Sequence, residues 1–329
     1  MSIIVKNPSE DIAKARPNIK PNTIKQYEIN LKKLKKLFDS EDYDFLKNPK
    51  DVMEKIKDIK YLSQRNILNA IIVLLMALNH DEKYDELIKQ YGEQRDKLNT
   101  QYETENKTGE FISEKQNQNF ANSDEIQGMI QSMEQKLKPL KKTDYDKWTK
   151  KDKALLQAYT IFTIYHKMPM RNDVAGMIAI NKRDYNKLSD TEKKENNYLV
   201  VSKDKMFFVL NKYKTSKKYE ELDLPIDDPN IKKALKYFLK VNGIDKGGVL
   251  FKTGTGKPLT RIELSKLLSK YSKEYLNKSV STTLLRKSYL TGKYGDMKKE
   301  MQKDSKVLGH DVANVGMNVY VKENAKKDE

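Results

Sequence analysis

Between Thr282 and Lys322 the chain contains T-T-L-L-R-K-S-Y-L-T, then V-L-G-H, then N-V-Y-V-K. These stretches place Arg286 in an apolar, helix-like segment, His310 after Leu-Gly, and Tyr320 ten residues further on. The planar guanidinium of an arginine holds two phosphate oxygens at once, and a tyrosine hydroxyl is able to attack phosphorus. This ordered set of residue types therefore suits chemistry on a phosphodiester.

The composition of the whole chain is strongly basic. The 329 residues and 38.4 kDa favour two domains, each with its own core. The 64 Lys and Arg residues outnumber 47 Asp and Glu residues, which gives a net charge of +17 and a pI near 9.4. This balance favours a polyanionic partner, and we expect double-stranded DNA. A basic protein without such a partner is the competing interpretation.

Several classes of protein are disfavoured. The absence of cysteine excludes a disulfide framework and a thiolate zinc site, and His80, His166 and His310 lie too far apart in sequence to suggest a metal site. The first six residues are too short an apolar run for a signal peptide. Residues 67–78 are too few to span a bilayer and predict a buried core helix. We expect no membrane association and an intracellular protein, cytoplasmic or nuclear in its host.

The charge is divided unevenly along the chain. Residues 1–80 carry 15 basic and 10 acidic side chains, residues 81–136 carry 7 and 13, and residues 137–329 carry 42 and 24. We therefore expect a helical DNA-binding domain over 1–80, an acidic helical connector over 81–140, and a basic domain over 141–329, with the boundary between 110 and 145.

Residues 1–80 show helical periodicity and no strand-forming run. Asn22 is a candidate N-cap, a short helix is expected over 52–59, and Ser63 is a candidate N-cap for the core helix. Apolar residues of the expected first long helix recur at helical spacing at Ile24, Tyr27, Leu31, Leu34 and Phe38.

The basic domain is expected to be mainly α with a small β-hairpin. Thr149 is a candidate N-cap for a helix that ends near His166, and the strands Met206–Leu210 and Glu221–Ile226 form the hairpin. A separate helix is expected over 297–308, with Met301 and Val307 facing inward, and Gly309 is expected as its left-handed C-cap.

Two further features add cations that suit a phosphate. Arg171 lies in Met168–Val174, where another helix is expected to begin, and it is the first arginine after Arg95 in a chain that otherwise uses lysine for its charge. Pairing of Arg171 with Asp173, or with a helix end, is the structural alternative. The hairpin loop, N-K-Y-K-T-S-K-K-Y from Asn211, concentrates lysines that either protonate a leaving oxygen or hold phosphate.

In their order, these segments resemble the catalytic signature of the tyrosine recombinase (phage-type integrase) family. The resemblance covers residues 140–322 well and residues 20–80 loosely. It implies a helical core-binding domain followed by a mixed α+β catalytic domain. The catalytic residues that it implies are Arg171, Lys214, Thr283, Arg286, His310 and Tyr320.

In such a mechanism Tyr320 attacks a DNA phosphorus, which leaves a 3′-phosphotyrosine and a free 5′ hydroxyl. Arg171 and Arg286 neutralise charge on the phosphate oxygens, His310 and Thr283 donate hydrogen bonds, and a lysine protonates the leaving oxygen. The Lys-Thr pair matches Lys214 best, while Lys212 and Lys217 remain possible. The family uses no metal or nucleotide cofactor, and four protomers hold two DNA segments.

The chain departs from the family's pattern in two places. Thr283 stands where the family usually has histidine, and threonine cannot act as a base near neutral pH. The spacing from His310 to Tyr320 is one residue longer than usual, although the rivals Tyr289 and Tyr294 both precede His310.

The remaining expectations concern DNA contacts, origin and alternatives. The abundance of Lys, Asn and Ile favours an AT-rich genome, such as that of a virus or mobile element. A type IB topoisomerase, a catalytically inactive DNA-binding relative, and a basic RNA-binding protein are the alternatives. The lysines expected to bind DNA are Lys25, Lys32, Lys36, Lys212, Lys217, Lys218 and Lys287.

Overall fold

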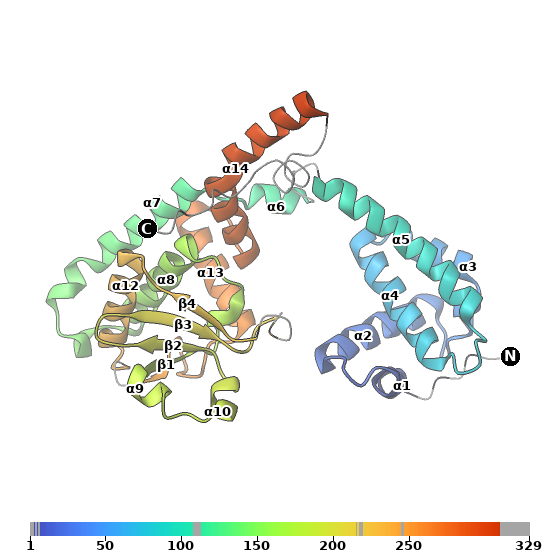
Figure 1. The fold of residues 1–329 in the computed structure, drawn as a ribbon, viewed down its shortest axis with the longest axis horizontal. Helices are drawn as coiled ribbons and strands as arrows, with labels where there is room; N and C mark the ends of the chain where they lie inside the picture. The colour runs from blue at the N-terminus through green and yellow to red at the C-terminus, as the bar shows by residue number, and fades with distance from the viewer. Residues whose placement is uncertain are drawn as a thin grey trace, which may run out of the picture. The chain divides into compact units, whose positions relative to one another are not determined.

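The computed structural model describes residues 3, 5, 7–107, 113–214, 216, 220–244 and 247–309. The chain divides into two compact units, Met1–Ile112 (unit 1) and Ser113–Glu329 (unit 2) (Figure 1). Within the described ranges the secondary structure is mainly helical, with one small mixed sheet in unit 2. The coarse fold prediction, mainly α with a small sheet, is confirmed.

Unit 1 is helical in all its described elements. Proline begins α1, α2 and α3, where its fixed φ suits the first helical turn and its missing N–H costs no hydrogen bond. The predicted N-caps are wrong: Asn22 and Ser63 lie inside the first turns, and the caps are Lys20 and Lys60. The helices are α1 (Pro8–Ala15), α2 (Pro21–Phe38), η1 (Asp44–Lys47), α3 (Pro49–Ile56), α4 (Tyr61–Leu78) and α5 (Asp85–Lys107).

Helix α4 forms the centre of the unit 1 core, as its apolar sequence predicts. Leu68, Ile71 and Leu75 are fully buried against α1, α2 and α5. By length and composition α4 also passes as a candidate membrane span, the one such helix among the described residues, and just over half of it is buried inside the unit. A core helix passes the same test.

Unit 2 contains the remaining helices. Its first helices are α6 (Glu114–Gln118), α7 (Ser123–Leu137), η2 (Pro139–Lys142), η3 (Tyr145–Lys147) and α8 (Lys150–Lys167). They are followed by η4 (Asn172–Val174), α9 (Lys182–Tyr185), α10 (Asp190–Lys194), α12 (Pro229–Val241), α13 (Arg261–Leu276) and α14 (Thr282–Leu308). The segment predicted as one acidic connector, 81–140, is thus shared: α5 packs on α4 in unit 1, and α7 packs on α8 in unit 2.

Helix α8 is the central helix of unit 2. Thr149 caps it as predicted, because its hydroxyl accepts from the Asp152 amide while the Asp152 carboxylate accepts from the Thr149 amide. Helices α7, α12, α13 and α14 all pack against it. Phe162 and Tyr165 are fully buried within this layer. The end of α8 therefore presents the following turn, at Arg171, from a rigid support.

The sheet has the order β4-β3-β2-β1-β5 within the described part of the chain (Figure 1). Strands β1 and β2 are parallel, and the other neighbours are antiparallel. The predicted hairpin is confirmed as β3 and β4. Helix α9 covers one face, where Tyr185 packs on Tyr198, Val200 and Val209. The strands are β1 (Ile178–Asn181), β2 (Tyr198–Val201), β3 (Met206–Leu210), β4 (Leu222–Pro225) and β5 (Gly248–Val249).

Helix α14 is a single helix from Thr282 to Leu308, longer than the predicted helix over 297–308. Gly309 ends it in the left-handed region, φ +72°, as predicted. The prediction that Val307 faces inward is wrong, since Val307 is 85% exposed. The reason is that only the first turns of α14, through Leu284, Leu285 and Ser288, pack into unit 2.

One prediction concerns the acid stability of unit 2. Burial, with a smaller effect of Lys167, holds the pKa of His166 below its ordinary value of 6.5. A depressed pKa gives stability that is present above pH 6.5 and lost as the pH falls through the folded-state value, because the ring must then be charged. Asp228 and Asp124 only partly oppose this effect.

We expect His166→Gln to lose less stability than the parent between pH 7 and pH 5. The measurement is the urea midpoint of the full chain, followed by the fluorescence of Trp148, the one tryptophan, which is buried in unit 2. Equal losses in the two proteins would show that His166 is not the responsible group.

Candidate phosphate-binding site

The turn after α8 carries the first predicted arginine. Arg171 is the N-cap of η4, and its side chain is exposed. Its backbone carbonyl accepts a 2.5 Å hydrogen bond from the hydroxyl of the fully buried Tyr165. Burial raises the pKa of this hydroxyl well above its ordinary value, so the hydroxyl stays a donor. The turn is thus fixed to the core while the guanidinium remains accessible.

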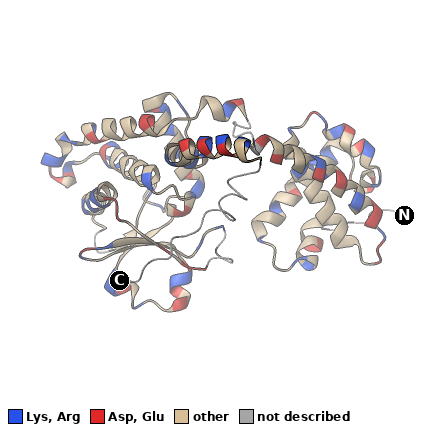
Figure 2. Cartoon of the chain, turned by 45° about the horizontal axis from the view of Figure 1, so that its top comes forward, with Lys and Arg blue, Asp and Glu red and all other residues tan. Residues whose placement is uncertain are grey.

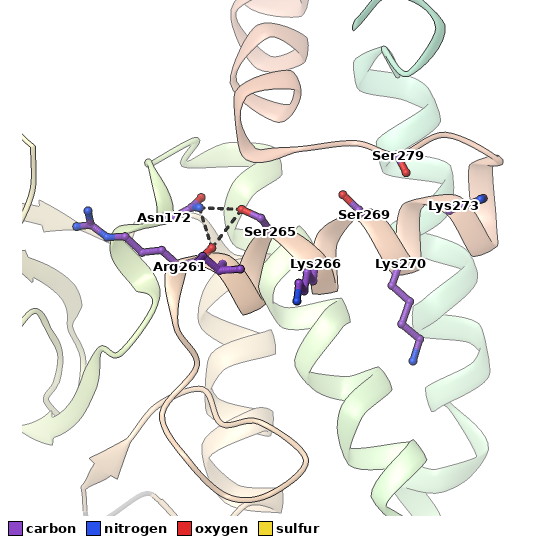
Figure 3. Close-up of a pocket in the computed structure, with 9 residues that line it drawn as sticks. Asn172, Arg261, Ser265, Lys266, Ser269, Lys270, Lys273 and Ser279 are labelled. Carbon is purple, nitrogen blue, oxygen red and sulfur yellow. Dashed lines mark hydrogen bonds between the residues drawn. The ribbon is translucent and has the colours of Figure 1, made fainter. Parts of the chain in front are cut away.

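The next residue joins this turn to α13. The Asn172 amide nitrogen donates to the Arg261 carbonyl at 3.0 Å and to the Ser265 hydroxyl at 2.9 Å (Figure 3). Both acceptors lie in the first turn or so of α13, which Thr260 and Glu263 begin with a reciprocal capping box. The turn at Arg171 is therefore held between two helices.

Asp173 is the electrostatic centre of the site. Its buried carboxylate pairs with the guanidinium of Arg261 at 3.0 Å. Burial raises the pKa of Asp173, and the positive charges of Arg261, Arg171 and Arg286 oppose that rise. All three arginines therefore act electrostatically on the Asp173 carboxylate, and Arg261 is the one among them that bonds to it. Arg171 was expected either to bind phosphate or to pair with Asp173. In the structure it is Arg261, and not Arg171, that forms the ion pair with Asp173.

Arg286 enters the site from the first turns of α14. Ser281 caps this helix through the Leu284 amide, and the buried Leu284 and Leu285 fix its rotation. The Arg286 side chain is half-buried, and Thr283, three residues earlier, is exposed. Residues three apart share one helix side, so Thr283 and Arg286 face the same direction.

The guanidinium groups of Arg171 and Arg286 have no hydrogen bond or close ion pair with any residue that the structure describes. Arg261, in contrast, is bound to the Asp173 carboxylate and, more weakly, to the Lys212 carbonyl at 3.4 Å. The two predicted arginines are therefore available for an anion, whereas the third holds their common turn in place.

The base of the hairpin loop lies beside the same turn. The Asn197 side chain bonds to the Asp173 carbonyl, the Asn211 amide, and both the amide and the carbonyl of Lys212. The side chains of Lys212 and Lys214 are exposed. Lysines 217 and 218 lie outside the described residues. The structure thus brings the start of the lysine-bearing loop to the arginine turn.

A shallow groove of about 610 Å³ continues from the turn along α13 (Figure 3). Asn172 and Arg261 lie at one end of it. In Figure 3 the hydroxyls of Ser265 and Ser269 lie on the side of Asn172, and Lys266 and Lys270 point away from them. The residues that line the groove are Asn172, Arg261, Ile262, Ser265, Lys266, Ser269, Lys270, Lys273 and Ser279. Cations and hydroxyls of this kind suit a phosphate backbone.

The other predicted residues are scattered. Lys287 donates to Gln116 of α6 at 2.9 Å within unit 2. Lys25, Lys32 and Lys36 are exposed on α2 in unit 1, and Lys32 pairs with Glu28 at 2.6 Å. His310 and Tyr320 lie outside the described residues. Their assignments therefore stay predictions.

Three residues of the site were missed by sequence reasoning. Arg261 had a signal, since the chain holds seven arginines and four of them lie in unit 2. The charges of Arg171, Arg261 and Arg286 oppose the rise in the pKa of Asp173. The fourth arginine, Arg183, acts on Asp184 instead. Asn172 and Asn197 had none, because their roles depend on bonds to residues distant in sequence.

No family model, no curated protein and no solved structure matches this chain. Among the described residues, no group of three or more His, Asp or Glu side chains is placed to hold a metal ion. The assignment of a function therefore depends on the geometry and chemistry of the site itself.

Proposed function

We propose that the chain is a DNA strand transferase of the tyrosine recombinase type, which cuts and rejoins DNA through a covalent 3′-phosphotyrosine. The observations that carry the proposal are the ion pair of Arg261 with Asp173 at 3.0 Å, the exposed Arg171 on the same turn, and the charge of Arg286, which also acts on Asp173. In a chain with 57 lysines, three of the four arginines of unit 2 act electrostatically on one carboxylate. Two of them leave their guanidinium groups unpaired among the described residues, as a phosphate-binding pair requires.

The chemistry follows from the arrangement. A phosphate held by Arg171 and Arg286 has the extra charge of its pentacoordinate state neutralised by two fixed cations. Thr283, on the same side of α14 as Arg286, adds a hydrogen-bond donor. Tyr320 is the nucleophile in this proposal, and His310 is a further donor. The order of both in the sequence supports these roles.

A lysine of the hairpin loop is the general acid in this proposal. Asn197 bonds to the backbone amide and carbonyl of Lys212 and so fixes this residue to the Asp173 turn. Lys214 follows two residues later. An exposed lysine side chain at this place is the group proposed to protonate the leaving 5′ oxygen. Lys214 is the preferred residue because the Lys-Thr pair matches the family's pattern.

Unit 2 is the catalytic domain in this proposal, and unit 1 is a second DNA-contacting domain, with the exposed lysines of α2 as its candidate contacts. Lysines and arginines are spread over the helices of both units and alternate with acids, whereas the sheet is largely uncharged (Figure 2). The DNA contacts of unit 2 are attributed to the groove beside α13, where Lys266 and Lys270 lie with serine hydroxyls. Assembly as a tetramer on DNA, and an intracellular location, are parts of the same proposal.

The DNA partner is tested by the salt dependence of binding. We expect the full chain to bind a random-sequence duplex with a log K that falls linearly with log salt. The slope falls by about 0.9 for each phosphate contact removed. The double variant Lys266→Ala/Lys270→Ala removes up to two phosphate contacts, so the magnitude of its slope should be smaller than that of the parent by up to about 1.8.

The matched control is Lys187→Ala/Lys299→Ala, which removes two lysines that pair with Asp184 and Asp296, each at 3.3 Å. It should leave the slope unchanged. Binding that does not respond to salt, or a preference for duplex RNA over duplex DNA, would contradict the proposed substrate.

A further inference from the structure

Asn197 is a buried polar residue just before β2, and only 7% of it is exposed. Its amide nitrogen donates to the Asp173 carbonyl at 2.9 Å and to the Lys212 carbonyl at 3.1 Å. Its carbonyl oxygen accepts from the Asn211 amide at 2.9 Å and from the Lys212 amide at 2.7 Å. The full capacity of the side chain, two donors and two acceptor sites, is used.

These four bonds join two segments that no strand pairing connects directly. One is the turn that carries Arg171 and Asp173, and the other is the first residues of the loop after β3. The partners also fix the orientation of the amide, because the nitrogen faces two carbonyls and the oxygen faces two N–H groups. An aspartate at this position has the same shape, but a carboxylate oxygen would replace the amide nitrogen. That oxygen cannot donate to the carbonyls of Asp173 and Lys212, so both bonds would be lost.

A further bond across this junction, between described residues, is weaker. The Arg261 guanidinium reaches the Lys212 carbonyl at 3.4 Å from a side chain that is 57% exposed. The Asn211 side chain anchors the loop elsewhere, to the carbonyls of Lys193 and Asn196. Asn197 is therefore the buried bridge between the arginine turn and the lysine loop.

We infer that Asn197 is a positioning residue, which sets the hairpin lysine at the distance from the arginine-held phosphate that proton transfer requires. The inference rests on the proposed function. In the step concerned, the tyrosine oxygen bonds to phosphorus and the P–O5′ bond breaks. The lysine proton passes to O5′, the phenolic proton passes to solvent, and the lysine regains a proton from solvent. Asn197 touches none of the reacting atoms.

A purely structural role and a positioning role differ in one respect. Loss of an acid matters only when the leaving group needs a proton. A duplex with sulfur in place of the bridging 5′ oxygen at the scissile phosphate releases a thiolate, and a thiol with a pKa near 8.5 departs without that help. If a variant only misplaces the lysine, its cleavage rate is therefore restored on the sulfur duplex. If a variant is misfolded or lacks an arginine of the site, its cleavage stays slow on that duplex.

The probe is a duplex selected from a random nicked pool by covalent capture with the parent chain, then synthesised with oxygen or sulfur at the mapped phosphate. We expect Asn197→Ala to slow cleavage of the oxygen duplex by about 100-fold, within the range for a lost general acid. Cleavage of the sulfur duplex should change less than about threefold, as expected when no proton is needed. Arg286→Ala should be slow on both.

Two further variants complete the experiment. Asn242→Ala removes an amide that donates to the Phe238 carbonyl at 2.9 Å, at the C-terminal end of α12, and should cleave both duplexes at the parent rate. Asn197→Asp keeps the acceptor to the Asn211 and Lys212 amides and is tested by the same ratio, so a poorly folded alanine variant does not decide the result. In a Lys214→Ala background, or in Lys212→Ala if that lysine is the acid, Asn197→Ala should add little on oxygen.

Equal slowing of Asn197→Ala and Asn197→Asp on the oxygen and sulfur duplexes overturns the inference and leaves the proposed function intact. Parent-like rates of both variants on oxygen overturn it as well. If the parent chain captures no duplex from the pool, the proposed function itself fails, and the inference fails with it.

Discussion

Arg286→Ala is expected to slow strand cleavage by about 100- to 1,000-fold, the usual cost of removing one fixed donor from a charge-stabilising site. The half-buried Arg286 side chain acts on Asp173 through its charge and has no hydrogen bond or close ion pair among the described residues. In the proposed mechanism, the loss of Arg286 leaves the guanidinium of Arg171 as the remaining unpaired arginine group that holds the phosphate. The measurement is the single-turnover rate of covalent adduct formation on the captured duplex.

Two variants define the specificity of this effect. Arg183→Ala removes an exposed arginine of the same unit, on α9, whose charge acts on Asp184 rather than on Asp173. It should cleave at the parent rate. Arg286→Lys keeps the charge without the planar fork and should fall between the parent and the alanine variant. A fast Arg286→Ala protein, or an equally slow Arg183→Ala protein, would remove the arginine pair from the mechanism.

Phe162→Ala is expected to destabilise unit 2 by about 3–5 kcal/mol, the range for truncating a large aromatic side chain in a core. Phe162 lies in α8 and is fully buried, in the helix against which α7, α12, α13 and α14 pack. The measurement is urea unfolding of the full chain, followed by the fluorescence of Trp148, which reports on unit 2 alone.

The matched control is Phe207→Ala on β3. Phe207 is only partly buried, with Lys182 over its ring at 4.8 Å, so its truncation leaves a smaller void and should cost clearly less. Equal effects of the two substitutions would show that α8 is not the centre of the core of unit 2.

The sequence predicts those elements whose causes are local. Thr149 caps α8 through a residue three positions away, and Gly309 ends α14 because glycine alone adopts a left-handed backbone without cost. The hairpin of β3 and β4 was predictable because Met206–Leu210 is a short apolar run, the partner segment alternates, and the two are close in sequence.

Strands β1, β2 and β5 were not predictable in the same way. They are two to four residues long, and β1 pairs with β2 in parallel across α9 and α10, while β5 returns from beyond α12. Such pairings depend on contacts distant in sequence. The exposed end of α14 was mispredicted because an apolar residue such as Val307 signals burial only where a second element is present to cover it.

The residues of the candidate site also fall into those that were predictable from the sequence and those that were not. Arg171 and Arg286 were identified from the sequence because arginine is scarce in a lysine-rich chain and the residue order has a precedent. In the structure the charges of both act on the Asp173 carboxylate, although the two arginines lie more than a hundred residues apart in sequence. The parts that hold them, Asn172, Asn197 and Arg261, carry no local pattern that separates them from ordinary polar residues.

Covalent capture of DNA is the measurement that tests the central claim most directly. The parent chain is incubated in EDTA with a pool of nicked random duplexes, in which the nick releases the strand downstream of a cut and so prevents rejoining. We expect a protein–DNA adduct that survives denaturation in the parent, in Tyr289→Phe and in Tyr294→Phe, and no adduct in Tyr320→Phe. An adduct of equal yield in Tyr320→Phe, or none in the parent, would contradict the account.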